Sequence, residues 1–292
     1  MKKRFFSILL TALMMLSLMP EAAGALGSSE VEAAGGGTPA AGQSQQAGSD
    51  MLAFLIDRGY PSDYLSGLIP QQLEDLYDLV CKKDLYYLQT THHQIQPYGN
   101  IPSQQLSFDT TISYTPVTIS GVTYYYNITV YVDYEWDELP IVRGVDAITV
   151  NWDGDILTYN EDFISKDYAY SPTQRKWITY KEWDKPNALN QGGLGINTYI
   201  NYEEQISPSE WMYADGLKGS MSFSLTPEPR LSMSIAPGAN STVINGEYVH
   251  NKNPYTGTLS FTYQGIGIAV SGSGSMQDSI ADPARIDYTR VE

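Results

Sequence analysis

The stretch Val122–Trp136, V-T-Y-Y-Y-N-I-T-V-Y-V-D-Y-E-W, decides the fold of this chain. Its apolar set occupies the even positions, which are Val122, Tyr124, Tyr126, Ile128, Val130, Val132, Tyr134 and Trp136. Its polar and aromatic set occupies the odd positions, which are Thr123, Tyr125, Asn127, Thr129, Tyr131, Asp133 and Glu135. Because side chains alternate faces along a strand, the pattern predicts one long two-faced strand. Such a strand is expected to be the spine of a sheet.

Residues 100–292 are predicted to form one all-β domain, since short alternating stretches recur there without a helical period. The candidate strands are Leu106–Thr115, Val122–Trp136, Ile141–Trp152, Ile156–Phe163, Lys176–Trp183, Gly195–Tyr202, Leu217–Leu225, Leu231–Ile235, Thr242–His250 and Thr258–Ser271. Turn signals separate most of them. The pattern predicts a mainly β fold, either an antiparallel β-sandwich or a partly closed barrel, preceded by a small α-helical hairpin.

Three details of these strands are specific enough to test. In Leu217–Leu225 the apolar residues alternate with Lys and Ser, which predicts one buried face and one polar face turned to water. The apolar parity switches within Thr258–Ser271, which predicts a single strand with a bulge at Gly265. The pair Asn245-Gly246 fits either a strand interior or a tight hairpin tip.

The N-terminal residues predict export. Residues 1–25 resemble a signal peptide, with a basic start, an apolar core and a cleavage site of small residues at Ala23-Gly24-Ala25. The alternative is an uncleaved N-terminal membrane anchor. Residues 26–48 are rich in Gly, Ala, Ser and Gln and are predicted to be a disordered linker. No later segment is apolar and long enough to be expected as a transmembrane helix after signal cleavage.

Residues 49–90 predict a helical hairpin. Gly59 and Pro61 end the first helix, and Pro70 begins the second. In the second helix Leu73, Leu76, Tyr77 and Val80 form an apolar stripe at helical spacing. A hairpin of this size holds little core of its own, so it is expected to pack on the β domain or to dock on a partner.

The run G-Y-P-S-D-Y-L-S-G-L-I-P-Q-Q-L-E-D-L-Y at residues 59–77 resembles a short helical module near the N-terminus of exported Gram-positive bacterial proteins. The later runs Y-E-W-D-E-L-P, Q-G-G-L-G and E-Y-V-H-N-K-N-P are similar to those of uncharacterised β-rich secreted proteins of the same bacteria. The resemblance implies Gram-positive-type export and a β fold. It implies no activity.

The charge and cysteine content exclude some functions. The formal net charge is −16, which argues against a nucleic-acid partner because phosphates require a basic surface. Cys81 is the single cysteine, so an internal disulfide is excluded. A large negative net charge helps to keep a protein soluble outside the cell, so we expect a secreted, acidic, extracellular protein.

The loop Asn151-Trp152-Asp153-Gly154-Asp155 is the candidate metal site. Asn151, Asp153 and Asp155 place oxygen-bearing side chains at alternate positions, which is how a calcium-binding loop begins. The glycine and the later acid do not match an EF-hand, and Asp-Gly is also common in a plain hairpin turn. Calcium is therefore the one cofactor to consider, and the alternative is no cofactor.

Candidate catalytic residues are few. The chain contains no G-x-S-x-G motif, and its three histidines comprise the neighbours His92-His93 and the distant His250. An extracellular hydrolase acting on glycan or peptide would instead need a carboxylate pair such as Asp133 with Glu203. We assign no catalytic residue.

Aromatic residues are the better candidates for binding. Trp183 and Trp211 lie beside predicted loops, where an exposed ring can contact a ligand. We expect a secreted, non-catalytic β-sandwich protein with a binding or structural role at the cell surface or outside the cell, with an unknown surface or extracellular ligand. The alternatives are the hydrolase and a membrane-active β-hairpin toxin, for which Gly257–Met276 is the insertion candidate.

Overall fold

The structure is a computed structural model. It describes residues 41–93, 106–136, 139–140, 143–228, 231–234, 240–251, 260–264, 267–271 and 277–290. The chain divides into two compact units, Met1–Ala41 and Gly42–Glu292, and the fold below concerns the second. The predicted signal peptide, residues 1–25, lies outside the described residues.

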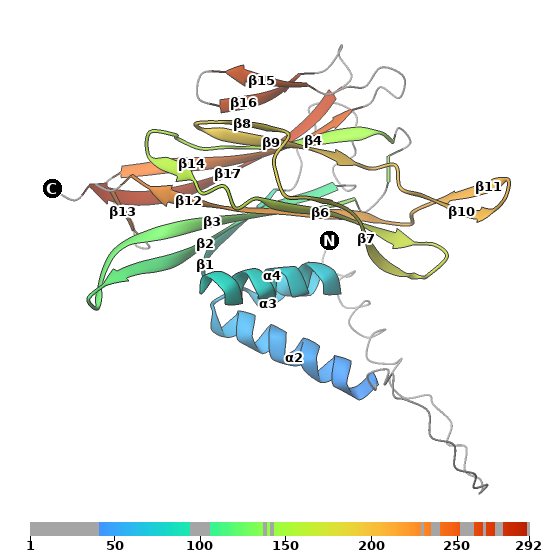
Figure 1. Cartoon of the computed structure of the whole chain (residues 1–292), viewed down its shortest axis with the longest axis horizontal. Helices are drawn as coiled ribbons and strands as arrows, with labels where there is room; N and C mark the ends of the chain where they lie inside the picture. Colours follow the sequence, from blue (N-terminus) through green and yellow to red (C-terminus); the bar gives the residue numbers. More distant parts are fainter. Residues whose placement is uncertain are drawn as a thin grey trace, which may run out of the picture. The chain divides into compact units, whose positions relative to one another are not determined.

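The first sheet is built around the strand that the sequence predicts as a spine (Figure 1). Its antiparallel order is β1 (Tyr86–His93), β2 (Leu106–Ile119), β3 (Val122–Trp136), β12 (Leu217–Pro227), β6 (Ile164–Ser171) and β7 (Lys176–Trp183), with β5 (Leu157–Tyr159) also paired to β12. Strand β3 has β2 on one side and β12 on the other. The prediction for β3 is confirmed at both ends.

The second sheet packs on the first. Its order is β13 (Leu231–Ser234), β17 (Gln277–Arg290), β14 (Asn240–Asn251), β4 (Val145–Asn151), β9 (Gly193–Tyr199) and β8 (Ala188–Asn190). Two small hairpins complete the described strands, β10 (Glu203–Ser207) with β11 (Glu210–Tyr213), and β15 (Ser260–Gln264) with β16 (Gly267–Ser271). The sheets are not closed, so of the two predicted architectures the antiparallel sandwich is confirmed.

The even-numbered face of β3 forms part of the sandwich interior. Ile128, Val130, Val132, Tyr134 and Trp136 are all buried in one apolar cluster with residues of the second sheet. Aromatic contacts join the sheets, since Trp136 and Tyr134 both pack against the ring of Tyr248 on β14. From Ile128 to Trp136 the alternation visible in the sequence therefore marks the interior face correctly, whereas Val122 at the start of the strand is 59% exposed.

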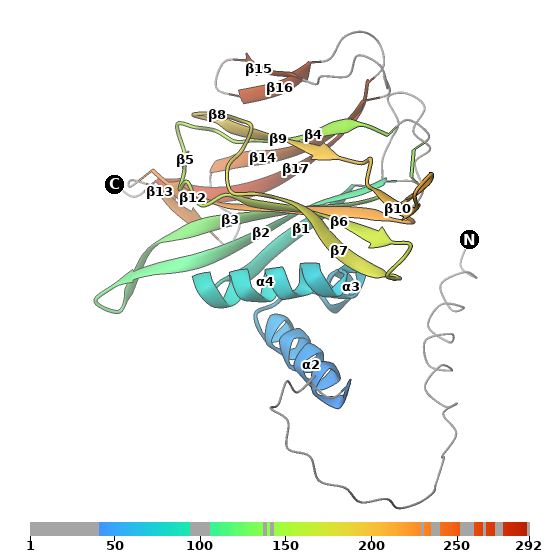
Figure 2. The same cartoon turned by 45° about the vertical axis from the view of Figure 1, so that its right-hand side comes forward.

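Three helices lie on the side of the first sheet opposite the second sheet, with α4 next to the sheet and α2 beyond it (Figures 1 and 2). They are α2 (Ala41–Asp57), α3 (Ser62–Gly67) and α4 (Pro70–Lys83). Leu76 and Val80 of the predicted stripe are buried in a second apolar cluster that includes Tyr131 from β3. The helical region thus docks on the β domain.

The boundaries of this helical region differ from the prediction. Helix α2 begins at Ala41, inside the range assigned to a disordered linker, and the short helix α3 lies between the two helices of the predicted hairpin. The range 49–90 also runs past the last helix, because α4 ends at Lys83 and β1 begins at Tyr86. Asp84 makes this sharp change of direction in the left-handed conformation, with φ 52°.

The predicted polar face of β12 is buried rather than turned to water. Lys218, Ser220, Ser222 and Ser224 alternate with the interior residues as expected, yet all four are buried. Helix α4 lies over them, and Gln72 of α4 donates from Nε2 to the carbonyl oxygen of Gly219 at 3.2 Å. Alternation shows that two faces differ, but it does not show what covers the polar one.

Two further strand predictions are decided by the structure. The single strand predicted at Thr258–Ser271 is wrong, because β15 and β16 form a hairpin with Phe261 opposite Val270. The reversal between them accounts for the switch in apolar parity, and Gly265 lies outside the described residues. Gly246 lies inside the continuous strand β14, where a Cβ would come within 2.8 Å of Thr110 Oγ1.

A glycine in β12 permits a buried contact across three strands. Tyr134, Gly219 and Asp167 lie side by side on β3, β12 and β6. The Tyr134 ring passes over Gly219, and its hydroxyl donates to Asp167 Oδ1 at 2.8 Å. A Cβ on Gly219 would lie 2.1 Å from the Tyr134 ring. This position therefore needs glycine for space.

We expect Gly219→Ala to lower the free energy of unfolding by roughly 1–3 kcal/mol, because the methyl group displaces the Tyr134 ring. The matched control is Gly144→Ala, where a Cβ meets nothing within 4 Å and the expected change is within about 0.5 kcal/mol. Chemical denaturation of both variants measures the difference. Equal stabilities would contradict the close packing.

Candidate functional site

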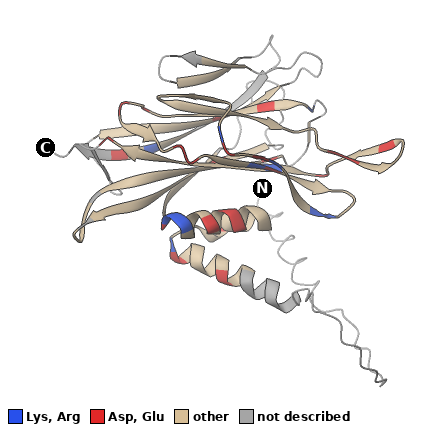
Figure 3. Ribbon diagram, in the orientation of Figure 1, with Lys and Arg blue, Asp and Glu red and all other residues tan. Residues whose placement is uncertain are grey.

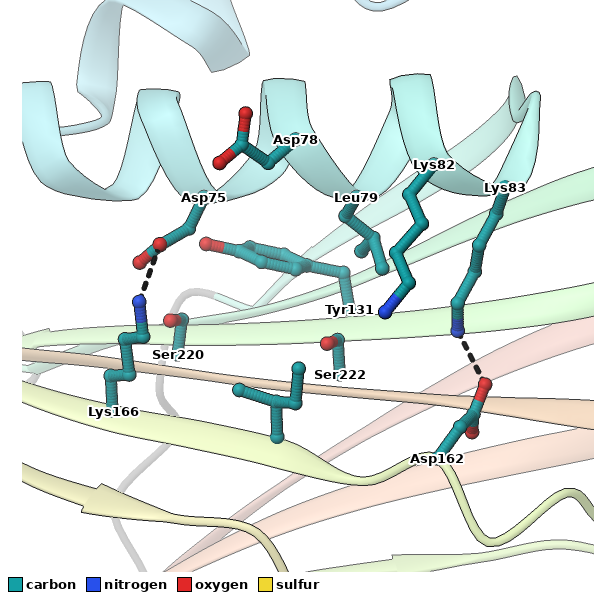
Figure 4. Close-up of a pocket in the computed structure, with 11 residues that line it drawn as sticks. Asp75, Asp78, Leu79, Lys82, Lys83, Tyr131, Asp162, Lys166, Ser220 and Ser222 are labelled. Carbon is teal, nitrogen blue, oxygen red and sulfur yellow. Dashed lines mark hydrogen bonds and ion pairs between the residues drawn. The ribbon is translucent and has the colours of Figure 1, made fainter.

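A pocket between α4 and the first sheet is the candidate site, and we call it the helix–sheet pocket (Figure 4). It has a volume of about 320 Å³, which is at the small end of the range for ligand sites. Its lining residues are Asp75, Asp78, Leu79, Lys82, Lys83, Tyr131, Asp162, Ile164, Lys166, Ser220 and Ser222. Its lining combines three lysines and three aspartates with the apolar surface of Leu79, Tyr131 and Ile164.

An ion pair lies at each end of the pocket. At one end Lys166 Nζ contacts Asp75 Oδ1 at 2.6 Å, and the hydroxyl of Tyr168 also donates to Asp75. At the other end Lys83 Nζ contacts Asp162 Oδ2 at 2.5 Å. Burial opposes ionisation of Asp162, but the Lys83 ammonium and the Ser224 N–H hold its pKa below the usual value. Both aspartates therefore have a lysine and a second donor.

Tyr131 lines the same pocket from β3 with an unsatisfied hydroxyl. Its side chain is 4% exposed, and its Oη has no hydrogen-bond partner among the described residues. Burial, followed by the charge of Asp133, raises the pKa of Tyr131 well above its usual value, so the group stays protonated. Ser220 is near enough to moderate that pKa, although it is not placed for a hydrogen bond of ordinary geometry.

Basic and acidic side chains of the pocket come largely from one helix. Figure 3 shows basic residues at the C-terminal end of α4 and acidic residues along it. Lys82 and Lys83 are in the last helical turn, where the helix dipole favours positive charge. No sequence motif reveals this site, because Lys83 and its contact Ser224 are 141 positions apart.

A second polar cluster lies beside the pocket on the same face of the sheet. His92, Asp109 and Asp133 are cross-strand neighbours on β1, β2 and β3. Burial, followed by the charge of Asp109, raises the pKa of Asp133 well above its usual value, while the Tyr64 hydroxyl opposes the shift. Asp133 belongs to this cluster, whereas Glu203 is exposed on β10 opposite Tyr213. The carboxylate pair suggested for a hydrolase is therefore split between two places.

A buried histidine and aspartate lie within the sandwich. His250 Nδ1 is 3.0 Å from both Asp146 carboxylate oxygens, and Tyr248 donates to Asp146 Oδ2 at 2.6 Å. The side chains of His250 and Asp146 are 2% and 0% exposed, so solvent has little access to the pair. Sequence reasoning missed this contact because its partners are 104 positions apart. The arrangement satisfies buried polar groups between the sheets.

The two predicted binding tryptophans have different surroundings. Trp183 is half-buried, stacks on Tyr199 at 6.3 Å between ring centroids and packs against the sandwich core. Trp211 lies on β11 and is 58% exposed. Of the two, Trp211 alone presents most of its ring to solvent.

The predicted calcium-binding residues make separate protein contacts. Asn151 Oδ1 accepts from the Ile268 N–H at 2.7 Å, and its Nδ2 donates to the Ile268 carbonyl at 3.0 Å. Asp153 accepts from the N–H of Asp155 at 3.0 Å within the turn. In the described part of the chain no group of three or more His, Cys, Asp or Glu is arranged to hold a metal ion. Calcium binding here stays a prediction.

Comparisons with models of known protein families, with curated protein sequences and with solved structures found no match. The resemblance to exported β-rich proteins therefore stays an expectation. Over the described ranges, no helix has the length and apolar character needed to cross a bilayer.

We expect the stability to fall as the pH rises from about 4 to about 7. Burial raises the pKa of Asp167 to about 7, against the opposing hydrogen bonds from Thr198 and Tyr134. Across this window the folded protein holds a proton that the unfolded chain has released, so raising the pH favours unfolding by up to about 4 kcal/mol. Denaturation at a series of pH values measures the slope.

Asp167→Asn is the matching variant, since the amide keeps the shape and cannot ionise. It should flatten the slope between about pH 4 and about pH 7 and leave the contribution of Asp133, which has the same sign. Identical slopes in the two proteins would show that Asp167 does not titrate as expected.

We expect Tyr131→Phe to raise the free energy of unfolding by up to about 1 kcal/mol, because it removes a buried donor that lacks a partner. Tyr64→Phe is the contrasting control. It deletes the hydrogen bond to Asp133 at 3.1 Å and should cost about 1 kcal/mol. Urea denaturation gives both values, and a loss of equal size in the two variants would contradict the assignment.

Proposed function

We propose that this is a secreted, non-catalytic protein that binds a ligand at the cell surface or outside the cell through the β10–β11 ribbon. The observation that carries the proposal is a set of exposed apolar side chains on that ribbon: Ile206 at 37%, Trp211 at 58%, Met212 at 41% and Tyr213 at 48%. A cluster of large apolar groups exposed to water is typical of an interaction surface.

The ribbon is placed to make contacts away from the sandwich. Its two strands pair with each other and belong to neither large sheet among the described strands, and they project beyond the sheets in Figure 1. Gln205 lies opposite Trp211 and Glu203 opposite Tyr213, so the two rings share one face of the ribbon. Two aromatic rings on one face can cover a flat apolar surface of a ligand.

The end of the ribbon nearest the sandwich, which we call its root, is fixed by contacts with other parts of the chain. The guanidinium of Arg143 lies over the Tyr213 ring at 4.4 Å. Glu204 accepts a hydrogen bond from the Tyr202 hydroxyl at 2.7 Å and another from Thr173. Hydrogen bonds from hydroxyl groups, with Ser171 and Thr173 first, lower the pKa of Glu204 to about 2, so it is ionised at neutral pH. A fixed root limits the ordering cost when the tip binds.

Trp183 supports this surface rather than forming it. With Tyr199 it packs beside a shallow groove of about 430 Å³ at the ribbon root, whose lining includes Tyr180, Tyr202 and Glu203. The aromatic surface thus continues from the ribbon onto the edge of the sandwich.

The positions of the relevant residues give less support to the two alternatives, a hydrolase and a membrane-active hairpin. A hydrolase would use Asp133 and Glu203 together, and these belong to different elements with different neighbours. A membrane-active hairpin would use Gly257–Met276, and the described part of that range is docked on the second sheet through Asn151 and Asn190. The binding proposal needs no such rearrangement.

We expect Trp211→Ala to reduce binding by tenfold or more without loss of stability, because an exposed ring at the centre of an interface contributes about 2 kcal/mol or more. Co-sedimentation with insoluble cell-wall glycans and surface plasmon resonance on extracellular proteins measure the binding. Val122→Ala is the control, since Val122 is equally exposed at 59% on another hairpin. Equal binding by wild type and Trp211→Ala, or turnover of any of these ligands, would overturn the proposal.

A further inference from the structure

One face of the β10–β11 ribbon combines aromatic rings with hydrogen-bonding groups. The amide of Gln205 lies directly opposite Trp211 in the antiparallel register. The carboxylate of Glu203 lies opposite Tyr213. Because directly opposite residues point to the same side of a ribbon, these four exposed side chains share one face. Such a face suits a ligand that has both apolar surfaces and hydroxyl groups.

A groove at the ribbon root continues this surface, and we call it the root groove. Its volume is about 430 Å³, and its lining residues are Tyr180, Lys181, Tyr199, Asn201, Tyr202 and Glu203. Three tyrosines with a few polar side chains are the usual composition of a ligand site. Glu203 belongs both to the ribbon face and to the root groove, so one elongated ligand can contact both.

The charges of this surface favour an uncharged ligand. The root groove has one lysine and one glutamate, so its formal charge is zero. The Lys181 ammonium lies 3.9 Å from the centre of the Tyr199 ring, and Arg143 covers one side of the Tyr213 ring. These two cations repel a positively charged ligand from the rings. A polyanion is disfavoured by the net charge of −16.

We propose that the ligand of the ribbon is a neutral polysaccharide, an inference that rests on the binding role proposed above for the ribbon. The C–H groups on one side of a hexose form an apolar face, and its hydroxyl groups lie around the rim. One sugar stacks on Trp211 and another on the free side of the Tyr213 ring, which is 48% exposed. Gln205, Glu203 and Asn201 form hydrogen bonds with sugar hydroxyls, and the chain continues into the root groove.

A glycan fits this surface better than a second protein does. The exposed apolar side chains are divided between the two faces of the ribbon, since Met212 lies opposite Glu204, on the face away from Trp211. A stable protein interface needs a contiguous desolvated centre and buries roughly 800 Å² on each partner. Separate rings, each beside a hydrogen-bonding group, suit a narrow chain of sugars instead.

Isothermal titration calorimetry with the intact protein tests the ligand class. The neutral probes are cellohexaose, chitohexaose and laminarihexaose, and hexagalacturonate is the anionic comparison. We expect at least one neutral hexasaccharide to bind with a dissociation constant of about 1 mM or tighter. It should bind about tenfold or more tightly than its disaccharide and than hexagalacturonate, because only a longer neutral chain reaches all the contacts. No heat with any neutral hexasaccharide, or equal affinity for hexagalacturonate, would overturn the proposal.

Variants of Trp211 separate stacking on an aromatic ring from general apolar contact. Trp211→Phe should stay within about threefold of wild type, whereas Trp211→Leu should bind about tenfold more weakly, because leucine has no aromatic face. Asn201→Ala should weaken hexasaccharide binding by about threefold to tenfold. Leu189→Ala is the control, since Leu189 is 42% exposed on β8, and it should bind normally. Equal affinities of the Phe and Leu variants would contradict stacking.

Trp211→Ala distinguishes failure of this inference from failure of the ribbon proposal. If only an extracellular protein binds, and Trp211→Ala abolishes that binding, the ribbon keeps its binding role and the glycan inference is wrong. If a neutral glycan binds and Trp211→Ala leaves its affinity unchanged, the ribbon is not the binding surface, and both proposals are wrong.

Discussion

Both faces of the central strands of the first sheet are buried, and the rest of the structure depends on this constraint. One face of β3 and β12 packs against the second sheet, and the other carries Thr, Ser, Lys and Asp beneath the helices. Buried polar groups require partners within the protein. The helices must therefore supply complementary polar groups as well as an apolar stripe.

Helix α4 meets both needs. Leu76 and Val80 bury the apolar stripe against Tyr131, while Gln72, Asp75 and Lys83 make hydrogen bonds or ion pairs with strands β12, β6 and the segment before β6. These polar contacts are specific in position, so they fix how the helix lies on the sheet. The helix–sheet pocket forms where the apolar stripe ends and the charged contacts begin.

Polar groups that are buried between the two sheets also have partners within the protein. Aspartates 146 and 167 are buried between the sheets, and tyrosine hydroxyls donate to each of them. Gly219 leaves the space through which one of these tyrosines reaches its aspartate. Where neither sheet nor helix covers the chain, as on the β10–β11 ribbon, apolar side chains remain exposed, and this contrast is the reason for proposing a binding role for the ribbon.

The sequence by itself determined the two-sided strands, the sandwich class and the helix that begins at Pro70, because strand alternation and helix capping depend on residues close in the chain. Strand β1, the hairpin β15–β16 and the burial of the polar face of β12 were decided by the tertiary structure, since each depends on what packs against the segment. The candidate functional residues divide in the same way between those that local sequence indicates and those that only the folded structure brings together. Trp211 could be chosen from its neighbours in sequence, whereas Lys82, Tyr131 and Ser220 meet in one pocket only because distant elements fold together. Local patterns record which face of a strand is polar, and only the packed structure shows whether water, a helix or a ligand covers it.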